Sequence, residues 1–85
     1  MDKHIIFGIK ISNRMQNVSS LQAVLTEFGC SIKTRLGLHE VSETSCSPNG
    51  LLILEMCGEI AAIEEMEAKL KMVSGIDIQK MVFDR

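Results

Sequence analysis

The stretch Leu51-Leu52-Ile53-Leu54-Glu55-Met56-Cys57 decides how this chain folds. It contains a single charge, follows the turn-forming Pro48-Asn49-Gly50, and is followed directly by Gly58. A short apolar run between turn formers is typical of a strand. Successive side chains point to opposite faces of a sheet, and both sets are mostly apolar here. We therefore expect an inner strand that is covered on both faces.

The first half of the chain predicts a strand, a helix and a second strand. Residues 3–11 alternate, with Ile5, Phe7, Ile9 and Ile11 on one face. A helix is expected to begin near residues 18–20, because Ser19 and Gln22 have capping-box spacing, and to end at Gly29 as a left-handed stop. Residues 30–38 alternate again, with residues 32, 34, 36 and 38 expected to face inward. The apolar stripe of the helix comprises Leu21, Val24, Leu25 and Phe28.

The second half repeats this order. Residues 39–50 have no hydrophobic period, so we expect a long connection that is functional or mobile. Residues 59–73 predict a second helix with an apolar stripe, Gly75 ends it, and residues 76–83 predict the last strand, whose alternation slips near Lys80. The stripe comprises Ile63, Met66, Leu70 and Val73.

The repeated strand-helix-strand order predicts one α+β domain over residues 1–85. The pattern is that of a ferredoxin-like βαββαβ sandwich, a four-stranded antiparallel sheet with two helices on one face. Its other face stays open, and soluble monomers seldom expose an apolar patch there. We therefore expect a homo-oligomer, a dimer or a tetramer. The expected interface comprises Ile6, Leu51, Ile53 and Cys57, with Met81 or Phe83 beside them.

Composition restricts the possible partners. The 85 residues have a formal net charge of -2 and a pI near 5.6, and clustered Lys and Arg are missing, so we expect no direct nucleic-acid binding. No apolar run is long enough to span a membrane, and the start of the chain lacks a signal-peptide pattern. We expect a cytoplasmic protein. Its three cysteines, Cys30, Cys46 and Cys57, have no C-x-x-C spacing and are expected to be free thiols.

Nearly the whole chain resembles a known family. The features that carry the resemblance are the first strand with its polar loop, the helix end Glu27-Phe28-Gly29, the segment Thr34-Arg35-Leu36-Gly37-Leu38 and the helix end Val73-Ser74-Gly75-Ile76. They resemble the small proteins known as iron-only hydrogenase system regulators. The resemblance implies an ACT-like fold, similar to the C-terminal domain of nickel-responsive regulators, and a regulatory, ligand-sensing or oligomerising role.

The loop after the first strand is a candidate ligand site. ACT domains that bind amino acids have an Asp-x-Pro-Gly type turn there, whereas residues 12–17 contain neither Pro nor Gly. Asn13, Arg14 and Asn17, beside free N–H groups at the helix start, are candidates for holding an anion or a carboxylate. The alternative is a solvated loop whose Asn17 or Ser19 caps the helix. Arg35, expected on the outer face, either pairs with Glu55 or binds a ligand carboxylate.

Metal binding and catalysis are not expected. The nickel-responsive relatives use several His and a Cys, and borderline metals favour three or four N or S ligands in one place. Here such residues are scattered, so we expect no metal and no cofactor; the alternative is a site shared by two subunits through His4 and Cys57. No Cys or Ser lies in a signature with a base, and no phosphate-binding loop is present, so we expect no enzyme.

Two function classes remain. The first is a ligand-sensing regulatory domain that binds a small-molecule effector at a subunit interface. It would act on transcription or on the hydrogenase system through a partner, because the chain has no DNA-binding element of its own. The alternative is a ligand-free protein interaction or oligomerisation module.

Overall fold

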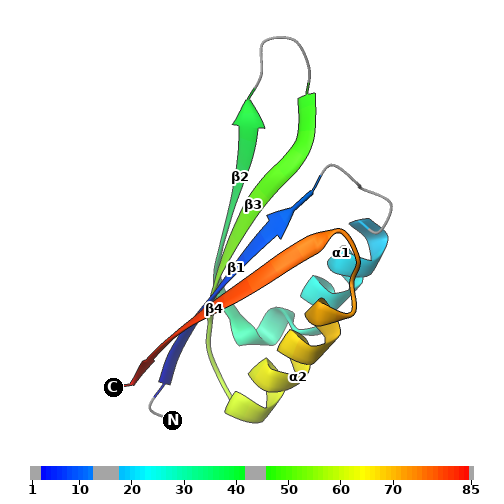
Figure 1. Cartoon of the computed structure of the whole chain (residues 1–85). Coiled ribbons are helices and arrows are strands. Elements are labelled where there is room, and N and C mark those ends of the chain that lie inside the picture. The colour runs from blue at the N-terminus through cyan, green and yellow to red at the C-terminus, as the bar shows by residue number, and fades with distance from the viewer. Residues whose placement is uncertain (1–2, 13–17, 42–45, 85) are drawn as a thin grey trace.

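A computed structural model describes residues 3–12, 18–41 and 46–84 of the chain. The strands form one antiparallel sheet in the order β2-β3-β1-β4, and both long helices cover the same face of it (Figure 1). This arrangement confirms the predicted α+β ferredoxin-like fold, with β1 and β3 as the inner strands. In chain order the elements are β1 (Lys3–Ile11), α1 (Val18–Glu27), the short 3-10 helix η2 (Gly29–Ser31), β2 (Ile32–Val41), β3 (Cys46–Met56), α2 (Ile60–Lys71) and β4 (Ile76–Asp84).

The hydrophobic core lies between the helices and the covered face of the sheet. The predicted stripes of both helices are buried, and so are alternate residues of β1 and β3. Burying one large apolar side chain stabilises a fold by roughly 1.5–3 kcal/mol. The sandwich is therefore held mainly by the facing side chains of β1, β3 and the two helices. The largest fully buried side chains are Phe7, Ile9, Leu54, Ile63, Met66 and Leu70.

Strand β2 departs from the predicted facing. A β-bulge places an extra residue in β2 between Ile32, which pairs with Met56, and Thr34, which pairs with Glu55. Directly opposed residues of an antiparallel pair share a face, so Thr34 and Leu36 lie on the open face and not in the core. The prediction that residues 34 and 36 face inward was therefore wrong.

The expected long connection after β2 is largely a hairpin. Strand β2 continues to Val41 and β3 begins at Cys46, where these two residues pair. In Figure 1 this hairpin extends beyond the end of the helices. The expected connection over residues 39–50 is therefore shorter than predicted, because both strands extend into a segment whose sequence has no hydrophobic period.

Gly58 and Gly75 adopt the left-handed backbone conformation at turns, whereas Gly29 does not. Gly58 has a φ of 93° between β3 and α2, and Gly75 has a φ of 85° before β4. These values lie in the left-handed region that glycine enters without a Cβ clash. Gly29, predicted to be such a residue, instead begins η2. At the far end of β1, Ser12 donates from its backbone nitrogen to the Gly75 carbonyl over 3.0 Å.

The apolar alternation of β4 is interrupted at Lys80 for a specific reason. Lys80 pairs with Phe7, whose side chain is buried, so Lys80 lies on the helix-covered face of β4. Its Nζ lies 2.9 Å from Glu67 Oε1 on α2. This ion pair lowers the pKa of the Glu67 carboxyl, with the Lys80 hydrogen bond as the main cause. The lysine therefore joins β4 to α2 where an apolar residue was expected.

Candidate functional site

Both helices lie on one face of the sheet, and no described element covers the opposite face (Figure 1). Ile6 and Ile53 on the two inner strands are half-buried, and the flanking side chains are exposed. The register places Met81 opposite Ile6 and Leu36 opposite Ile53. Between the inner strands Ile6 lies opposite Glu55 and Ile53 lies opposite Gly8, so these apolar side chains follow a diagonal across the four strands. We call this surface the apolar patch; it comprises Ile6, Leu36, Leu51, Ile53, Met81 and Phe83.

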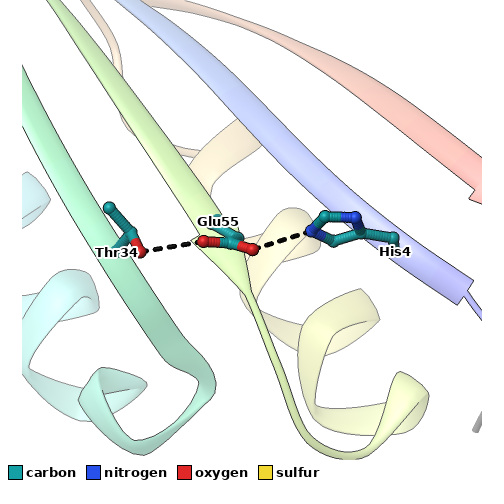
Figure 2. Close-up of polar contacts among 3 residues, drawn as sticks. All are labelled: His4, Thr34 and Glu55. Carbon is teal, nitrogen blue, oxygen red and sulfur yellow. Dashed lines mark hydrogen bonds and ion pairs between the residues drawn. The ribbon is translucent and has the colours of Figure 1, made fainter.

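A polar row borders the patch near the N-terminal end of β1. Figure 2 shows the Glu55 carboxylate of β3 between Thr34 of β2 and His4 of β1. Thr34 Oγ1 donates to Glu55 Oε1 over 2.8 Å, and His4 Nε2 lies 2.8 Å from Glu55 Oε2. The His4 ring also lies against Phe83 of β4, with 6.0 Å between the ring centroids. The row therefore links all four strands on the open face.

The environment of Glu55 favours its charged form. The hydrogen bond from Thr34, and after it the one with His4, lower the pKa of this carboxyl below its ordinary value of 4.5. A negative charge is thus fixed at the border of the patch. It lies in a shallow depression of about 510 Å³ that is also lined by Lys3, Lys33, Cys57 and Glu59.

A second depression of about 520 Å³ lies over Gly8 in the middle of the open face. A Cβ at Gly8 would meet no atom within 4 Å, so the missing side chain leaves the backbone of β1 uncovered. Leu51 lines one side of the depression, and Lys10 and Asp77, which pair across β1 and β4, line the other. The site therefore combines an apolar wall with one positive and one negative side chain, and neither of these is ion-paired to another described residue.

The residues predicted for a site are only partly brought together. Ile6, Leu51 and Ile53 share the open face, as the expected interface requires. Cys57 lies at its margin, directly after β3, where its Sγ donates to the Cys30 carbonyl over 3.7 Å. The candidate ligand residues Asn13, Arg14 and Asn17 fall outside the described residues.

Arg35 does not lie where the sequence predicts. It pairs with Leu54, whose side chain is in the core, so Arg35 is on the helix side of the sheet edge and is exposed. The partner of Glu55 on β2 is Thr34, and the predicted pair of Arg35 with Glu55 is wrong. The β-bulge is the physical reason, because one extra residue exchanges the two faces.

Sequence reasoning missed the position of Thr34 and Leu36 on the open face. It also missed the depression over Gly8. Alternation predicts Leu36 in the core, whereas the residue is 51% exposed. Gly8 was the one residue without a side chain in an otherwise bulky inner strand, and such a glycine often marks a close approach. That feature was the available clue to the depression.

Within residues 3–12, 18–41 and 46–84, no three His, Cys, Asp or Glu side chains are grouped so that they could hold a metal ion. Across the same ranges, no helix has the length and apolar character that crossing a membrane requires.

Comparison with known proteins supports the fold. No protein-family model matches the sequence, and no curated protein matches it. An uncharacterized protein from Thermotoga maritima is similar in structure, with a TM-score of 0.80 at 20% identity, over 98% of this chain and 100% of that one.

Two further solved structures have the same arrangement at lower similarity. A formyltetrahydrofolate deformylase from Pseudomonas putida KT2440 matches 92% of this chain, which spans 28% of the enzyme chain, with a TM-score of 0.54 at 11% identity. The de novo designed protein Foldit4 matches 100% of this chain and 99% of its own, with a TM-score of 0.54 at 10% identity. At these identities the likeness shows that the chain has a ferredoxin-like fold and nothing about its activity.

Proposed function

We propose that this chain is a small ACT-like regulatory domain that self-associates through the open face of its sheet. The observation that carries this proposal is the apolar patch, in which Leu36, Met81 and Phe83 are each more than half exposed. Contiguous exposed apolar surface of this kind marks an interaction site in soluble proteins. A small domain also gains stability when association covers such a surface.

A second copy of the chain suits this face better than an unrelated partner. Lys10 and Asp77 lie side by side next to the patch, so the same surface supplies both signs of charge. A twofold interface uses one patch on both subunits and therefore requires this kind of self-complementarity. Covering the face would also convert the depression over Gly8 into an enclosed space, which suits a small-molecule effector.

The proposed role is regulatory and not catalytic. The Cys57 thiol donates to the Cys30 carbonyl and not to the imidazole of His4, which lies against Glu55, so these two side chains do not form a nucleophile–base pair. The resemblance to iron-only hydrogenase system regulators supports a role in controlling that system or its transcription through a protein partner. Because the sequence has a net charge of -2 and no run of Lys and Arg, we propose no direct nucleic-acid binding, and the free thiols of Cys30 and Cys57 suit a reducing cytoplasm.

The melting temperature at several protein concentrations tests self-association. Mass action makes the melting temperature of an oligomer rise with concentration, whereas that of a monomer stays constant. We expect the wild type to show this rise and Ile53→Lys, with a charge in the middle of the patch, to lose it. A wild-type melting temperature that is independent of concentration would contradict the proposal.

Ligand sensing is tested by the thermal shift that small molecules produce. A ligand at a hundred times its dissociation constant stabilises its target by about 2.7 kcal/mol. Gly8→Val places side-chain atoms in the central depression, and its Cβ would meet no atom within 4 Å, so the variant should fold and lose the shift if the effector binds there. A ligand-free interaction module is the second candidate, because association alone would cover the patch. A ligand-free module predicts that no small molecule raises the melting temperature of the wild type or of Gly8→Val.

A further inference from the structure

Two cysteines that are distant in sequence meet at the margin of the open face. Cys30 is the middle residue of η2, and Cys57 directly follows β3, 27 positions later. The Cys57 backbone nitrogen donates to the Ser31 carbonyl over 2.8 Å, which attaches η2 to the end of β3. The Cys57 thiol itself points to the Cys30 carbonyl, 3.7 Å away.

This geometry brings the Cys57 thiol against the backbone of Cys30. A carbonyl oxygen lies about 2.4 Å from the Cα of its own residue, so the Cα of Cys30 is at most about 6 Å from Cys57 Sγ. The Cα of Cys57 lies two bonds beyond that sulfur, and disulfide partners have Cα atoms roughly 4.4–6.8 Å apart. Closing the bond therefore requires a rotation of the Cys30 side chain and a movement of η2, a single 3-10 turn, toward the end of β3.

Both thiols are free, and they differ in access. Cys30 is exposed, whereas Cys57 is half-buried beside it. An external oxidant therefore reaches Cys30 first, and Cys57 is the neighbouring thiol that resolves the product. The third cysteine is at the other end of β3. Eleven strand positions separate Cys46 from Cys57, or about 36 Å at about 3.3 Å per residue, so Cys46 cannot join this pair within one chain.

We propose that Cys30 and Cys57 are a redox-responsive pair that closes into an intramolecular disulfide by exchange with a low-molecular-weight disulfide. The Cys30 thiolate attacks one sulfur of the small disulfide, breaks its S–S bond and releases one small thiol. The Cys57 thiolate then attacks the Cys30 sulfur of the mixed disulfide and displaces the second small thiol. Two protein thiols are oxidised, one small disulfide is reduced to two thiols, and the cysteine protons pass to the released thiolates.

The product would be a covalent link between η2 and the end of β3, next to the depression that contains Glu55. The margin of the open face would then respond to the thiol–disulfide balance of its surroundings. This inference does not depend on self-association, because the bond forms within one chain. Its failure would leave the proposed function untouched, and the reverse also holds.

The test is incubation of the full-length chain with oxidised glutathione, followed by intact mass measurement and peptide mapping without reductant. We expect the wild type to lose two hydrogens and to yield a peptide pair linked through Cys30 and Cys57, in a fraction independent of protein concentration. Cys46→Ser, at the other end of β3, is the matched control and should form the same internal link as the wild type.

The single variants define the failure of the proposal. Cys30→Ser and Cys57→Ser, each checked for the wild-type circular dichroism spectrum, should lose the internal link completely, and the remaining thiol of the pair should keep its glutathione adduct. Wild-type protein that keeps separate adducts on Cys30 and Cys57, or that forms only disulfide-linked dimers, would overturn the proposal.

Discussion

Thr34 on β2 donates a hydrogen bond to Glu55 on β3, with 2.8 Å between the threonine Oγ1 and the carboxylate Oε1. This bond is the first cause of the lowered pKa of Glu55, ahead of the hydrogen bond with His4. It also reports the register of the sheet, since only the bulged arrangement of β2 brings position 34 opposite position 55. One pair of side chains thus ties the facing of an edge strand to the charge on the open face.

Thr34→Val should raise the pKa of Glu55 toward its ordinary value of 4.5, because it removes the larger of the two hydrogen bonds to the carboxylate. The measurement is a titration of the Glu55 carboxyl carbon by NMR. Thr26→Val is the matched control, since Thr26 is exposed on α1, which covers the face of the sheet opposite to Glu55. An identical Glu55 pKa in wild type and Thr34→Val would contradict the assignment.

The same shift predicts how stability depends on pH. A carboxyl whose pKa is lower in the folded than in the unfolded chain stabilises the fold above its unfolded pKa. That contribution is lost as the pH falls through the folded pKa. We therefore expect the free energy of unfolding of the wild type to exceed that of Glu55→Gln most above pH 4.5, and the difference to narrow below it. Urea unfolding at a series of pH values measures this, and a constant difference would refute it.

Leu36→Lys should fold, because the bulge places this side chain on the open face, where it is 51% exposed. Leu54→Lys, on the neighbouring strand, should not fold, because its position is fully buried and an unpaired buried charge costs several kcal/mol. Circular dichroism and urea unfolding of both variants distinguish the faces. Loss of structure in Leu36→Lys would show that β2 follows simple alternation and has no bulge.

Gly58→Ala should destabilise the fold by about 1–2 kcal/mol, because a Cβ is strained at a φ of 93°. The nearest atom to that Cβ would be Ser31 Oγ at 4.0 Å, so the cost is one of backbone conformation and not of crowding. Gly29→Ala is the matched control, since it has open space and no positive φ, and should change stability by no more than about 0.5 kcal/mol. Urea unfolding measures the loss of unfolding free energy in both variants. Equal losses in Gly58→Ala and Gly29→Ala would contradict the assignment of the left-handed turn to Gly58.

Periodicity predicted the fold well where side chains pack on the core. The apolar stripes of both helices, the alternation of β1 and the inner position of β3 all follow from burial, which constrains every second or every third to fourth residue. The same reasoning failed at residues 39–41 and 46–50, whose strands extend beyond the end of the helices (Figure 1), because their sequence has no apolar period.

The site was less predictable because it depends on register. Ile6, Leu51 and Ile53 were placed on the open face correctly, since both inner strands are regular. The predicted faces of Leu36 and Arg35 are the reverse of the observed ones. Nothing in the sequence of residues 30–38 distinguishes a bulged strand from a regular one. The pairing of Thr34 with Glu55 and the approach of Cys57 to Cys30 are tertiary relationships that no local pattern encodes.

The most direct test of self-association through the open face is the solution mass by light scattering of three proteins. We predict an oligomer of the 9.4 kDa chain for the wild type and a folded monomer for Ile53→Lys. Met72→Lys is the matched control, because Met72 is 85% exposed but follows α2 in the helix layer, and it should keep the wild-type mass. A wild-type mass of 9.4 kDa, or a Met72→Lys variant that dissociates as Ile53→Lys does, would contradict the account.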